Sequence, residues 1–368
     1  MPAEPAIKQD IRFCTAPDDV RLAYAISGDG PPLVMSIPWL TDLECRSQSL
    51  VWRPWLEAFS ADHKLLSYDL RGCGLSNRNP AELSLEAWIH DFESVVDAAD
   101  FKQFSILATC QHGPVAIEYA AKHPERVRKI VLYCTYARGR MKRPDRPFET
   151  EKTRVAASLL RTGWAQDDAL LQIWAHAFQP GGSLEHWRSW CDFQRAATSA
   201  ETATRMIETG WNVDVSNAAR KIKCPVLVLH SEGDQVVPIE EGRALVSLIP
   251  GSRFIEIDSE NHMPLADEPA WPRVVSDIRN FLAESAPARP AHALPLEELT
   301  PRELSVLEGI ADGMDNAQLA ASLGISEKTV RNHITRIFDK TNVKHRYEAI
   351  VRARDAGLGA SSRLTRAL

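Results

Sequence analysis

The chain has 368 residues, of which 44% are hydrophobic and 25% charged, and its net charge is −6. This length allows two domains with a sizeable core in the larger one, and the composition is ordinary for a soluble globular protein. Uninterrupted apolar runs stay below the roughly 18 residues that a membrane span needs, and the N-terminal residues lack the pattern of a signal peptide. The seven cysteines form no C-x-x-C pair and no cluster at zinc spacing. We therefore expect a cytoplasmic protein with no membrane partner, no metal site and no cofactor.

The charge is unevenly distributed along the chain. Residues 296–368 hold 11 Lys/Arg against 10 Asp/Glu, whereas the preceding part holds 32 against 39. Within Ser326–Arg346 the count is 6 against 2, a local excess of four positive charges. An acidic body with a locally basic tail module indicates that only the tail meets a polyanion, although a solvated helix face would give the same count.

Strands and helices alternate through the first part of the chain. The expected strands are Ile11–Thr15, Arg21–Ser27, Leu33–Ile37, Lys64–Tyr68, Phe104–Ala108 and Val127–Cys134. The first two form a hairpin through Pro-Asp-Asp, and helical patterns cover Leu50–Phe59, Leu83–Ala99 and the stretch that follows residue 111. Such alternation predicts a mostly parallel sheet with helices on both faces.

The alternation is interrupted from Tyr136 to about Ala219, where only helical patterns occur and five of the ten tryptophans lie. It begins with a basic loop, Arg138–Pro147, which we expect to be solvated surface. Strand and helix patterns then resume at Pro225–His230, Ile239–Ile249, Arg253–Ile257 and Trp271–Ala283. An insertion of helices between two strands of one sheet predicts a lid or cap over the sheet edge.

The stretch Phe104–Gly113, FSILATCQHG, has the layout of a nucleophile elbow. A buried strand turns at once into a helix, with a nucleophile-capable residue, Cys110, at the turn. The usual pattern is G-x-S-x-G, and small residues are needed where helix and strand pass closely. Ala108 meets this requirement on one side, whereas His112 does not meet it on the other, and Gly113 comes one place late.

Two later loops supply the partners that a cysteine nucleophile needs, a base and a group that orients it. Asp234 follows the strand Pro225–His230, and His262 follows the strand Arg253–Ile257. Both loops fall at the carboxyl ends of strands, where open α/β sheets place their ligand sites. Two other interpretations of Cys110 stay open: a small buried residue in a degenerate pocket, or a redox-sensing thiol.

With these motifs in the order nucleophile, acid, histidine, residues 10–285 resemble the α/β-hydrolase fold superfamily, and the YDLRGCGLS turn adds to the likeness. The resemblance implies Cys110 as nucleophile, Asp234 as orienter and His262 as base, in a triad similar to that of the dienelactone-hydrolase branch. It also implies an oxyanion hole from the Gln111 backbone N–H and one near Trp39. Ile37-Pro38 stands where the family carries His-Gly. We expect His112, Trp187 and Trp190 to complete the pocket wall.

The C-terminal stretch predicts four short helices. Thr300 and Glu303 form a capping box with Pro301 between them, followed by helices expected at Asn316–Leu323, Glu327–Lys340 and Tyr347–Ala356. Gly324 breaks the second helix and Ser326 caps the third. A short helix, a glycine turn and a basic helix form a helix-turn-helix arrangement.

Leu299–Leu358 resembles the LuxR-type (NarL/FixJ-like) DNA-binding domain, with LTPRE-x-x-VL, N-x-x-LA-x-x-L-x-I-S-x-x-TV-x-x-H and K-x-x-x-x-R at matching places. The resemblance implies double-stranded DNA as partner, with base contacts from Arg331, Asn332 and Thr335. Phosphate contacts would come from Lys328, Thr329, His333 and Arg336. The fourth helix is similar to the family's dimerisation helix, which implies a homodimer on two half-sites.

The expected organisation is an α/β-hydrolase-fold domain at 1–285 with a helical cap at about 137–219, a linker at 286–297, and an all-α four-helix helix-turn-helix domain at 298–368. Two functions follow. One is a transcriptional regulator whose front domain senses a small, largely apolar ester, lactone or acid-type ligand, by covalent or slow hydrolytic chemistry at Cys110. The other is a working cysteine-type esterase, lactonase or thioesterase with an appended DNA-binding domain.

Overall fold

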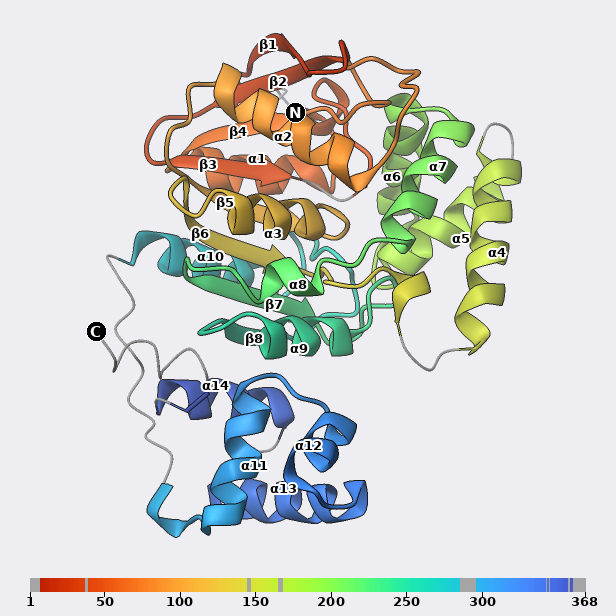
Figure 1. Ribbon diagram of the computed structural model, residues 1–368. Coiled ribbons are helices and arrows are strands. Elements are labelled where there is room, and N and C mark those ends of the chain that lie inside the picture. Colours follow the sequence, from red (N-terminus) through yellow and green to blue (C-terminus); the bar gives the residue numbers. More distant parts are fainter. Residues whose placement is uncertain are drawn as a thin grey trace.

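In a computed structural model, described here for residues 7–36, 39–143, 147–164, 168–284, 296–341, 343, 345–356 and 358–359, a central sheet and its helices form the larger part (Figure 1). A smaller helical module holds the C-terminal part of the chain. The linker expected at 286–297 falls mostly outside the described residues, as do Ile37-Pro38.

The sheet has eight strands in the order β1-β2-β4-β3-β5-β6-β7-β8. They are β1 Asp10–Thr15, β2 Arg21–Ser27, β3 Pro32–Ser36, β4 Lys64–Tyr68, β5 Phe104–Thr109, β6 Val127–Tyr133, β7 Val226–Ser231 and β8 Arg253–Ile257. The first two strands form the expected antiparallel hairpin, and β2 also pairs antiparallel with β4. All other neighbours are parallel. The carboxyl ends of six strands therefore meet at one edge, where the functional loops lie.

Side chains alternate across the sheet, so each parallel strand feeds two cores. In β3, Leu33 and Met35 pack into one core with α1 Trp52–Ser60 and α10 Trp271–Ala283. Val34 points to the opposite core, under the remaining helices of the sheet domain. These are α2 Leu85–Ala98, α3 His112–Lys122, α8 Ser216–Ala219 and α9 Ile239–Leu248. Both faces are covered, which explains why the strands read as nearly continuous apolar runs.

Four helices form a cap beside the carboxyl edge of the sheet (Figure 1). They are α4 Pro147–Gly163, α5 Asp168–Phe178, α6 Leu184–Ala197 and α7 Ala200–Trp211. Ser183 and Ser199 cap α6 and α7 with their hydroxyls, as expected of N-cap residues. Short 3₁₀ turns occur at Cys45–Ser47 and Arg140–Lys142. The inserted helical segment is therefore present where the sequence predicted it.

The C-terminal module packs four helices around its own core: α11 Pro301–Ala311, α12 Asn316–Leu323, α13 Glu327–Thr341 and α14 Arg346–Asp355. Thr300 and Glu303 form the expected capping box, with Pro301 at the start of α11. Gly324 ends α12 in the left-handed conformation with φ of 65°, which glycine adopts without strain. A 3₁₀ turn, Leu296–Glu298, precedes the module.

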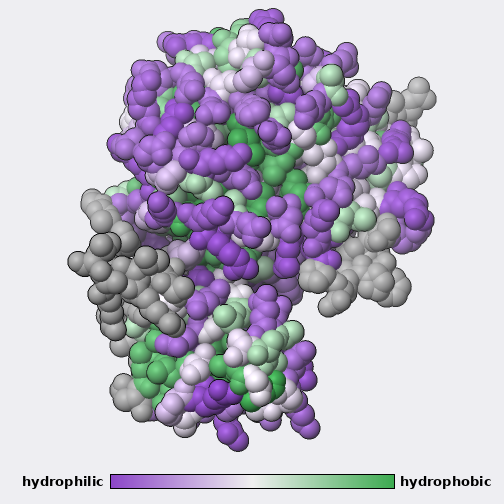
Figure 2. Space-filling view, in the orientation of Figure 1, coloured by the Kyte–Doolittle hydropathy of each residue, from purple (hydrophilic) through white to green (hydrophobic). Residues whose placement is uncertain are grey.

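The fold class expected from sequence, an α/β sheet domain plus an all-α module, is confirmed. Several elements have the expected ends, and the ends of the others differ by one or two residues. The surface in Figure 2 is mainly hydrophilic, and hydrophobic side chains gather where the sheet domain meets the cap. Among the described helices, none is long and apolar enough to cross a bilayer.

Candidate functional site

Cys110 occupies the sharp turn between β5 and α3. Its backbone φ of 49° lies in the left-handed region that non-glycine residues rarely adopt. Neighbouring residues hold this conformation: the Cys110 amide donates to the Tyr133 carbonyl at 3.2 Å, and the Cys110 carbonyl accepts from the Thr135 hydroxyl. The thiol thus stands at the carboxyl edge of the sheet, just before the N-terminus of α3.

After Cys110, the position that requires a small residue is Gly113 rather than His112. A Cβ atom on Gly113 would lie 1.9 Å from Oγ1 of Thr135, so glycine is required there. His112 can therefore be large. Its ring is buried, lies edge-on to Tyr68 at 6.4 Å, and does not line the cavity around Cys110. Burial lowers the pKa of His112 to about 4, so the expected pocket residue is a neutral packing residue.

The loops after β7 and β8 bring Asp234 and His262 together. Nδ1 of His262 lies 2.7 Å from Oδ2 of Asp234, and both side chains are fully buried. Oδ1 of Asp234 accepts from the amides of Val236 and Val237 at 2.8 and 3.0 Å, which orients the carboxylate. Burial opposes the charged imidazole, but Asp234 and then Cys110 outweigh it and raise the pKa of His262 well above its usual value. The structure thus groups the three side chains predicted as a triad.

The second ring nitrogen of His262, Nε2, is the atom that would exchange a proton with Cys110. Nε2 is buried and has no hydrogen-bond partner in the described part of the chain, and Cys110 acts electrostatically on the same ring. An imidazole that is oriented at Nδ1 and open at Nε2 can take the thiol proton and return it to a leaving group. The arrangement is therefore suited to acylation of Cys110.

A second thiol, Cys134, also contacts this group, and sequence reasoning missed it. Thr109 pairs with Tyr133 in the sheet, so Cys110 and Cys134 each follow a paired residue at the ends of adjacent strands. Burial, and then the Asp234 charge, raise the pKa of Cys134 to about 11, against a lowering by His262. Sγ of Cys134 accepts from the Ser231 amide at 3.3 Å. Cys134 is thus a neutral thiol behind the imidazole.

One ligand atom each from Cys134, Asp234 and His262 lies within 4.8 Å of the others, a donor set of types that zinc accepts. The carboxylate and imidazole atoms, however, are 2.7 Å apart. Two ligands at about 2.0–2.1 Å from one tetrahedral ion would be separated by about 3.3 Å. This spacing is that of an acid–base hydrogen bond rather than of two metal ligands.

The cavity at Cys110 is small, about 40 Å³, and is enclosed by the cap. Its lining residues come from the sheet edge and from cap helices: Trp39, Cys110, Gln111, Tyr136, Arg140, Arg143, Trp174, Phe178, Ile207, Trp211, Val236 and Val237. A space of this size admits water, whereas ligand pockets commonly measure ~300–1,000 Å³. A ligand of ordinary size therefore requires movement of the cap.

Two predicted oxyanion residues, Trp39 and Gln111, line this cavity. Nε2 of Gln111 donates to the Trp39 carbonyl at 3.2 Å, and Trp39 has a positive φ of 33°. The two predicted cap tryptophans lie behind the wall instead. Trp190 packs on Phe178 at 5.2 Å, and Trp187 donates to the Gln179 carbonyl at 2.7 Å. Neither lines the cavity, because α5 stands between α6 and the thiol.

The expectation that the basic loop Arg138–Pro147 is solvated surface is wrong in part. Arg140 and Arg143 line the cavity, and the Arg143 side chain is only 4% exposed. The guanidinium of Arg143 lies over the Tyr136 ring at 5.6 Å, and that of Arg140 over Trp211 at 5.7 Å. The sequence of such a charge-rich loop predicts an exposed position. Only the packing of Arg143 over the Tyr136 ring places this side chain in the interior.

The cap directly contacts the loop that carries His262. The His262 amide donates to the Phe178 carbonyl at 2.8 Å, and the two rings meet edge to face at 5.2 Å. The Gly181 amide donates to Oδ1 of Asn261 at 2.9 Å. Displacement of the end of α5 by a ligand would therefore also disturb the position of His262.

In the C-terminal module, α13 presents a polar face to solvent. Val330 and Ile337 are buried in the module, with Ile334 and Phe338 packed partly against them. The exposed residues of this helix include Lys328, Arg331, Asn332, Thr335 and Arg336, while Thr329 and His333 are half-buried. Every side chain predicted to meet DNA is therefore at least partly accessible on one helix.

The module is docked on the sheet domain through α14. Arg354 donates to the carbonyls of Val246, Ile249 and Ser247 at 3.0, 2.7 and 2.9 Å, at the end of α9. Tyr347 lies edge-on to Phe254 of β8 at 4.8 Å. A cation is well placed there because the C-terminal carbonyls of a helix are otherwise unsatisfied.

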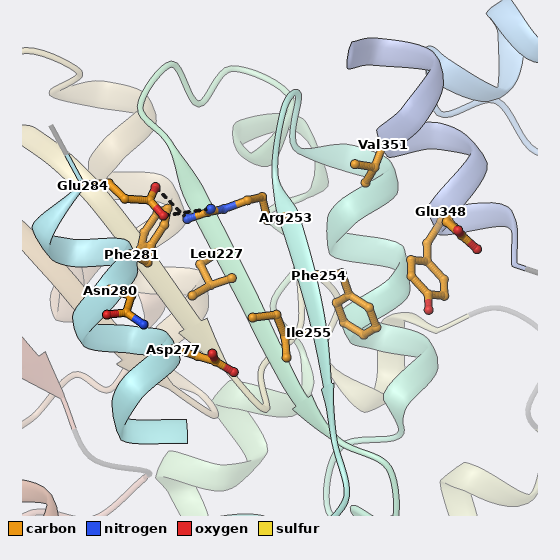
Figure 3. Close-up of a pocket in the computed structure, with 11 residues that line it drawn as sticks. Leu227, Arg253, Phe254, Ile255, Asp277, Asn280, Phe281, Glu284, Glu348 and Val351 are labelled. Carbon is orange, nitrogen blue, oxygen red and sulfur yellow. Dashed lines mark hydrogen bonds and ion pairs between the residues drawn. The ribbon is translucent and has the colours of Figure 1, made fainter. Parts of the chain in front are cut away.

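A hollow of about 350 Å³ lies at this junction, between α10, β8 and α14. Figure 3 shows the residues that line it. Arg253 and Glu284 form an ion pair on one side, and Val351 and Glu348 of α14 lie on the other. β8 is the edge strand of the sheet, and α14 reaches it through the ring contact of Tyr347 with Phe254. The DNA-binding module and the sheet are thus mechanically connected.

Together these features define the class of protein. An elbow nucleophile followed in chain order by an acid and a histidine, at strand ends of a capped parallel sheet, is the layout of α/β hydrolases. The four-helix module with its exposed polar third helix is of the helix-turn-helix kind. The chain belongs to the alpha/beta hydrolase fold family, whose model matches residues 45–269, and residues 297–353 match the luxR family of bacterial regulatory proteins.

Relatives divide along the same line. Pyrrolizixenacetamide deacetylase of Xenorhabdus hominickii is 25% identical over 271 residues, which is 72% of this chain and 95% of the relative. Transcriptional regulatory protein LiaR of Bacillus subtilis (strain 168) is 36% identical over 132 residues, 36% of this chain and 61% of LiaR. The esterase RhEst1 from Rhodococcus sp. ECU1013 shares the fold with a TM-score of 0.63 at 23% identity, over 75% of this chain and 99% of the esterase.

Proposed function

We propose that this protein is a cytoplasmic DNA-binding transcriptional regulator whose hydrolase-fold domain senses a small, largely apolar ester, lactone or acid. The observation that carries the proposal is the physical junction between the two parts. Arg354 of the DNA-binding module is hydrogen-bonded to the end of α9, in the domain that holds the Cys110 cavity. An enzyme with an unrelated appendage would not need this junction.

Sensing acts through Cys110. A bound ester or lactone is attacked by the thiolate, with the carbonyl oxygen facing the Gln111 and Trp39 backbone, and His262 supplies the proton to the leaving group. Slow deacylation then keeps the domain in an occupied state. The cavity of about 40 Å³ supports this reading, since rapid turnover requires an open path for substrate and product.

Signal transfer uses α14, the helix that resembles the family's dimerisation helix. Docking on α9 and pairing with a second copy compete for this helix, so the docked chain is monomeric and the undocked chain forms a homodimer on two DNA half-sites. A ligand shifts this balance only as far as its affinities for the two states differ.

DNA retardation with and without host-cell extract tests the proposal. The wild-type protein should prefer a promoter fragment in a salt-sensitive manner. Cys110→Ser should keep the fold, and Cys110→Ala should still bind ligand and DNA if occupancy is the signal. Native mass spectrometry of protein from its own host should show a bound molecule or an adduct on Cys110. Absence of any fragment preference under both conditions would reject the regulator.

The alternative is an active cysteine-type hydrolase with an appended DNA-binding domain. The complete Asp234–His262 pair favours it, and so does likeness to a protein named as a deacetylase. Multiple-turnover hydrolysis of simple aryl esters, abolished in Cys110→Ala together with the transcriptional response, would support this function. Turnover of less than one ester per protein molecule would favour the sensor.

A further inference from the structure

Arg143 places a buried cation with unused hydrogen-bonding capacity in the wall of the Cys110 cavity. Nε of Arg143 donates to the Arg138 carbonyl at 3.3 Å and lies 3.3 Å from Oε1 of Glu241. Nη1 is buried and has no hydrogen-bond partner among the described residues. A buried donor that is left unpaired costs free energy, and more so on a charged group. The site therefore lacks an acceptor that a ligand can supply.

The charges around the cavity favour an anion. Two of its described lining residues, Arg140 and Arg143, are cationic, and none is anionic. Glu241 lies 3.3 Å from Nε of Arg143 and is not among the described lining residues. In an enclosed space, such attraction is weakly screened by solvent.

We infer that the cavity binds the carboxylate of a small organic acid, or of an ester that carries a second, free carboxylate. Arg143 anchors the carboxylate and Arg140 lies beside it. This inference deepens the proposed sensing function and rests on it. Guanidinium is the group that matches a planar carboxylate with two parallel hydrogen bonds, whereas a neutral ligand would leave Nη1 unpaired.

The remaining walls indicate the rest of the ligand. Trp39, Trp174 and Trp211 surround the same space, with Trp39 and Trp174 at 6.0 Å from each other. A carboxylate at Arg143 therefore leaves an apolar or aromatic body to lie between indole rings, with Cys110 on the cavity wall within reach. The recognised class is a short apolar or aromatic acid rather than a long-chain neutral ester.

Alkylation of Cys110 by two small reagents tests this assignment. Iodoacetate and iodoacetamide form the same S–C bond and release iodide, and they differ in carrying a carboxylate or a neutral amide. The ratio of their rates at Cys110, followed by mass spectrometry, should exceed the ratio for free glutathione by about tenfold or more. Acetate should protect Cys110 from iodoacetate better than acetamide does.

Arg143→Gln should bring the rate ratio to the glutathione value, while Arg154→Gln, on an exposed pair of α4, should leave it unchanged. If Arg143→Gln unfolds by circular dichroism, Arg143→Lys and the acetate protection in the wild type carry the test. A wild-type ratio equal to that of glutathione, a ratio unchanged by Arg143→Gln, or a Cys110 that reacts with neither reagent would overturn the inference. Promoter binding is measured on the same samples. Promoter binding without selectivity for iodoacetate would reject only the carboxylate site. Selectivity for iodoacetate without promoter binding would reject only the regulator.

Discussion

At the scale of single residues, the site is governed by what burial does to ionisable groups. Asp234 and His262 are buried as a pair, so their mutual attraction is strong, whereas His112 is buried without a charged partner and stays neutral. The same residue type is thus a proton carrier in one place and packing material in another. Two substitutions separate these effects.

Asp234→Asn removes the charge that raises the pKa of His262, so the imidazole should be neutral at pH 7. We expect alkylation of Cys110 by iodoacetamide at pH 7 to slow by about tenfold, because the sulfur loses the positive charge of the neighbouring imidazolium. Because the folded-state pKa of His262 is raised, the stability that His262 contributes is complete below its unfolded value of pH ~6.5 and is lost as the pH rises through the raised folded-state value. Exposed Asp258→Asn is the control, and equal rates in both variants would contradict the role of Asp234.

His112→Gln should reduce the acid sensitivity of the fold. The folded-state pKa of His112 is about 4, so the unfolded chain binds this proton first as the pH falls below ~6.5. The wild type should therefore lose about 3 kcal/mol more stability between pH 7 and pH 4 than His112→Gln does. Urea unfolding at several pH values measures this difference, with exposed His90→Gln as control. If the free energy of unfolding changed with pH in parallel for the wild type and His112→Gln, the His112 ring would titrate in the folded protein and the prediction would be wrong.

At the scale of elements, packing decides which side chains are accessible. The buried apolar face of α13 fixes which of its polar side chains point outward. In the cap, α5 stands between α6 and the thiol, which gives Trp174 and Phe178 the lining role instead of Trp187 and Trp190.

Two α13 variants should weaken DNA binding in different ways. Arg331→Ala should cost about 1–3 kcal/mol on a fragment selected by the wild type and relax preference at one base position. Lys328→Ala should weaken all sequences alike and reduce the slope of log affinity against log salt by about one. Competition binding at several salt concentrations distinguishes them. Identical loss on selected and random fragments for both variants would contradict base contact by Arg331.

At the scale of the whole molecule, the connection between the domains combines polar and apolar contacts of α14. Arg354 provides three hydrogen bonds to the end of α9, and the ring contact of Tyr347 with Phe254 adds to them. Charged hydrogen bonds of this kind contribute roughly 1.5–3 kcal/mol each when they cannot be replaced by water. A ligand would break this contact only if its affinities for the docked and undocked states differed by a comparable free energy.

Arg354→Ala should release α14 from the sheet domain. We expect amide hydrogen exchange in α14 to rise by about tenfold or more, because undocking removes its cover. Arg352→Ala is the matched control, since its ion pair with Glu348 at 2.5 Å and its hydrogen bond to the Thr341 carbonyl at 3.3 Å both lie within the C-terminal module. Sedimentation should also show more dimer for Arg354→Ala. Unchanged hydrogen exchange in α14 and an unchanged sedimenting mass would show that docking of α14 does not control dimerisation.

The sequence alone determined the order of strands and helices, the inserted cap, the Cys110–Asp234–His262 set and the outward face of α13. These features depend on local periodicity, turn residues and chain order, which physical chemistry ties closely to sequence. Tertiary structure alone decided which side chains line the cavity, because lining depends on packing between segments that are distant in the chain. Packing over the Tyr136 ring places Arg143 in the interior, and the strand register places Cys134 next to His262. Gly113 occupies the position that requires a small residue, so His112 can be large and packs elsewhere. The docking of Arg354 on α9 joins two domains whose separate sequence patterns contain no information about each other.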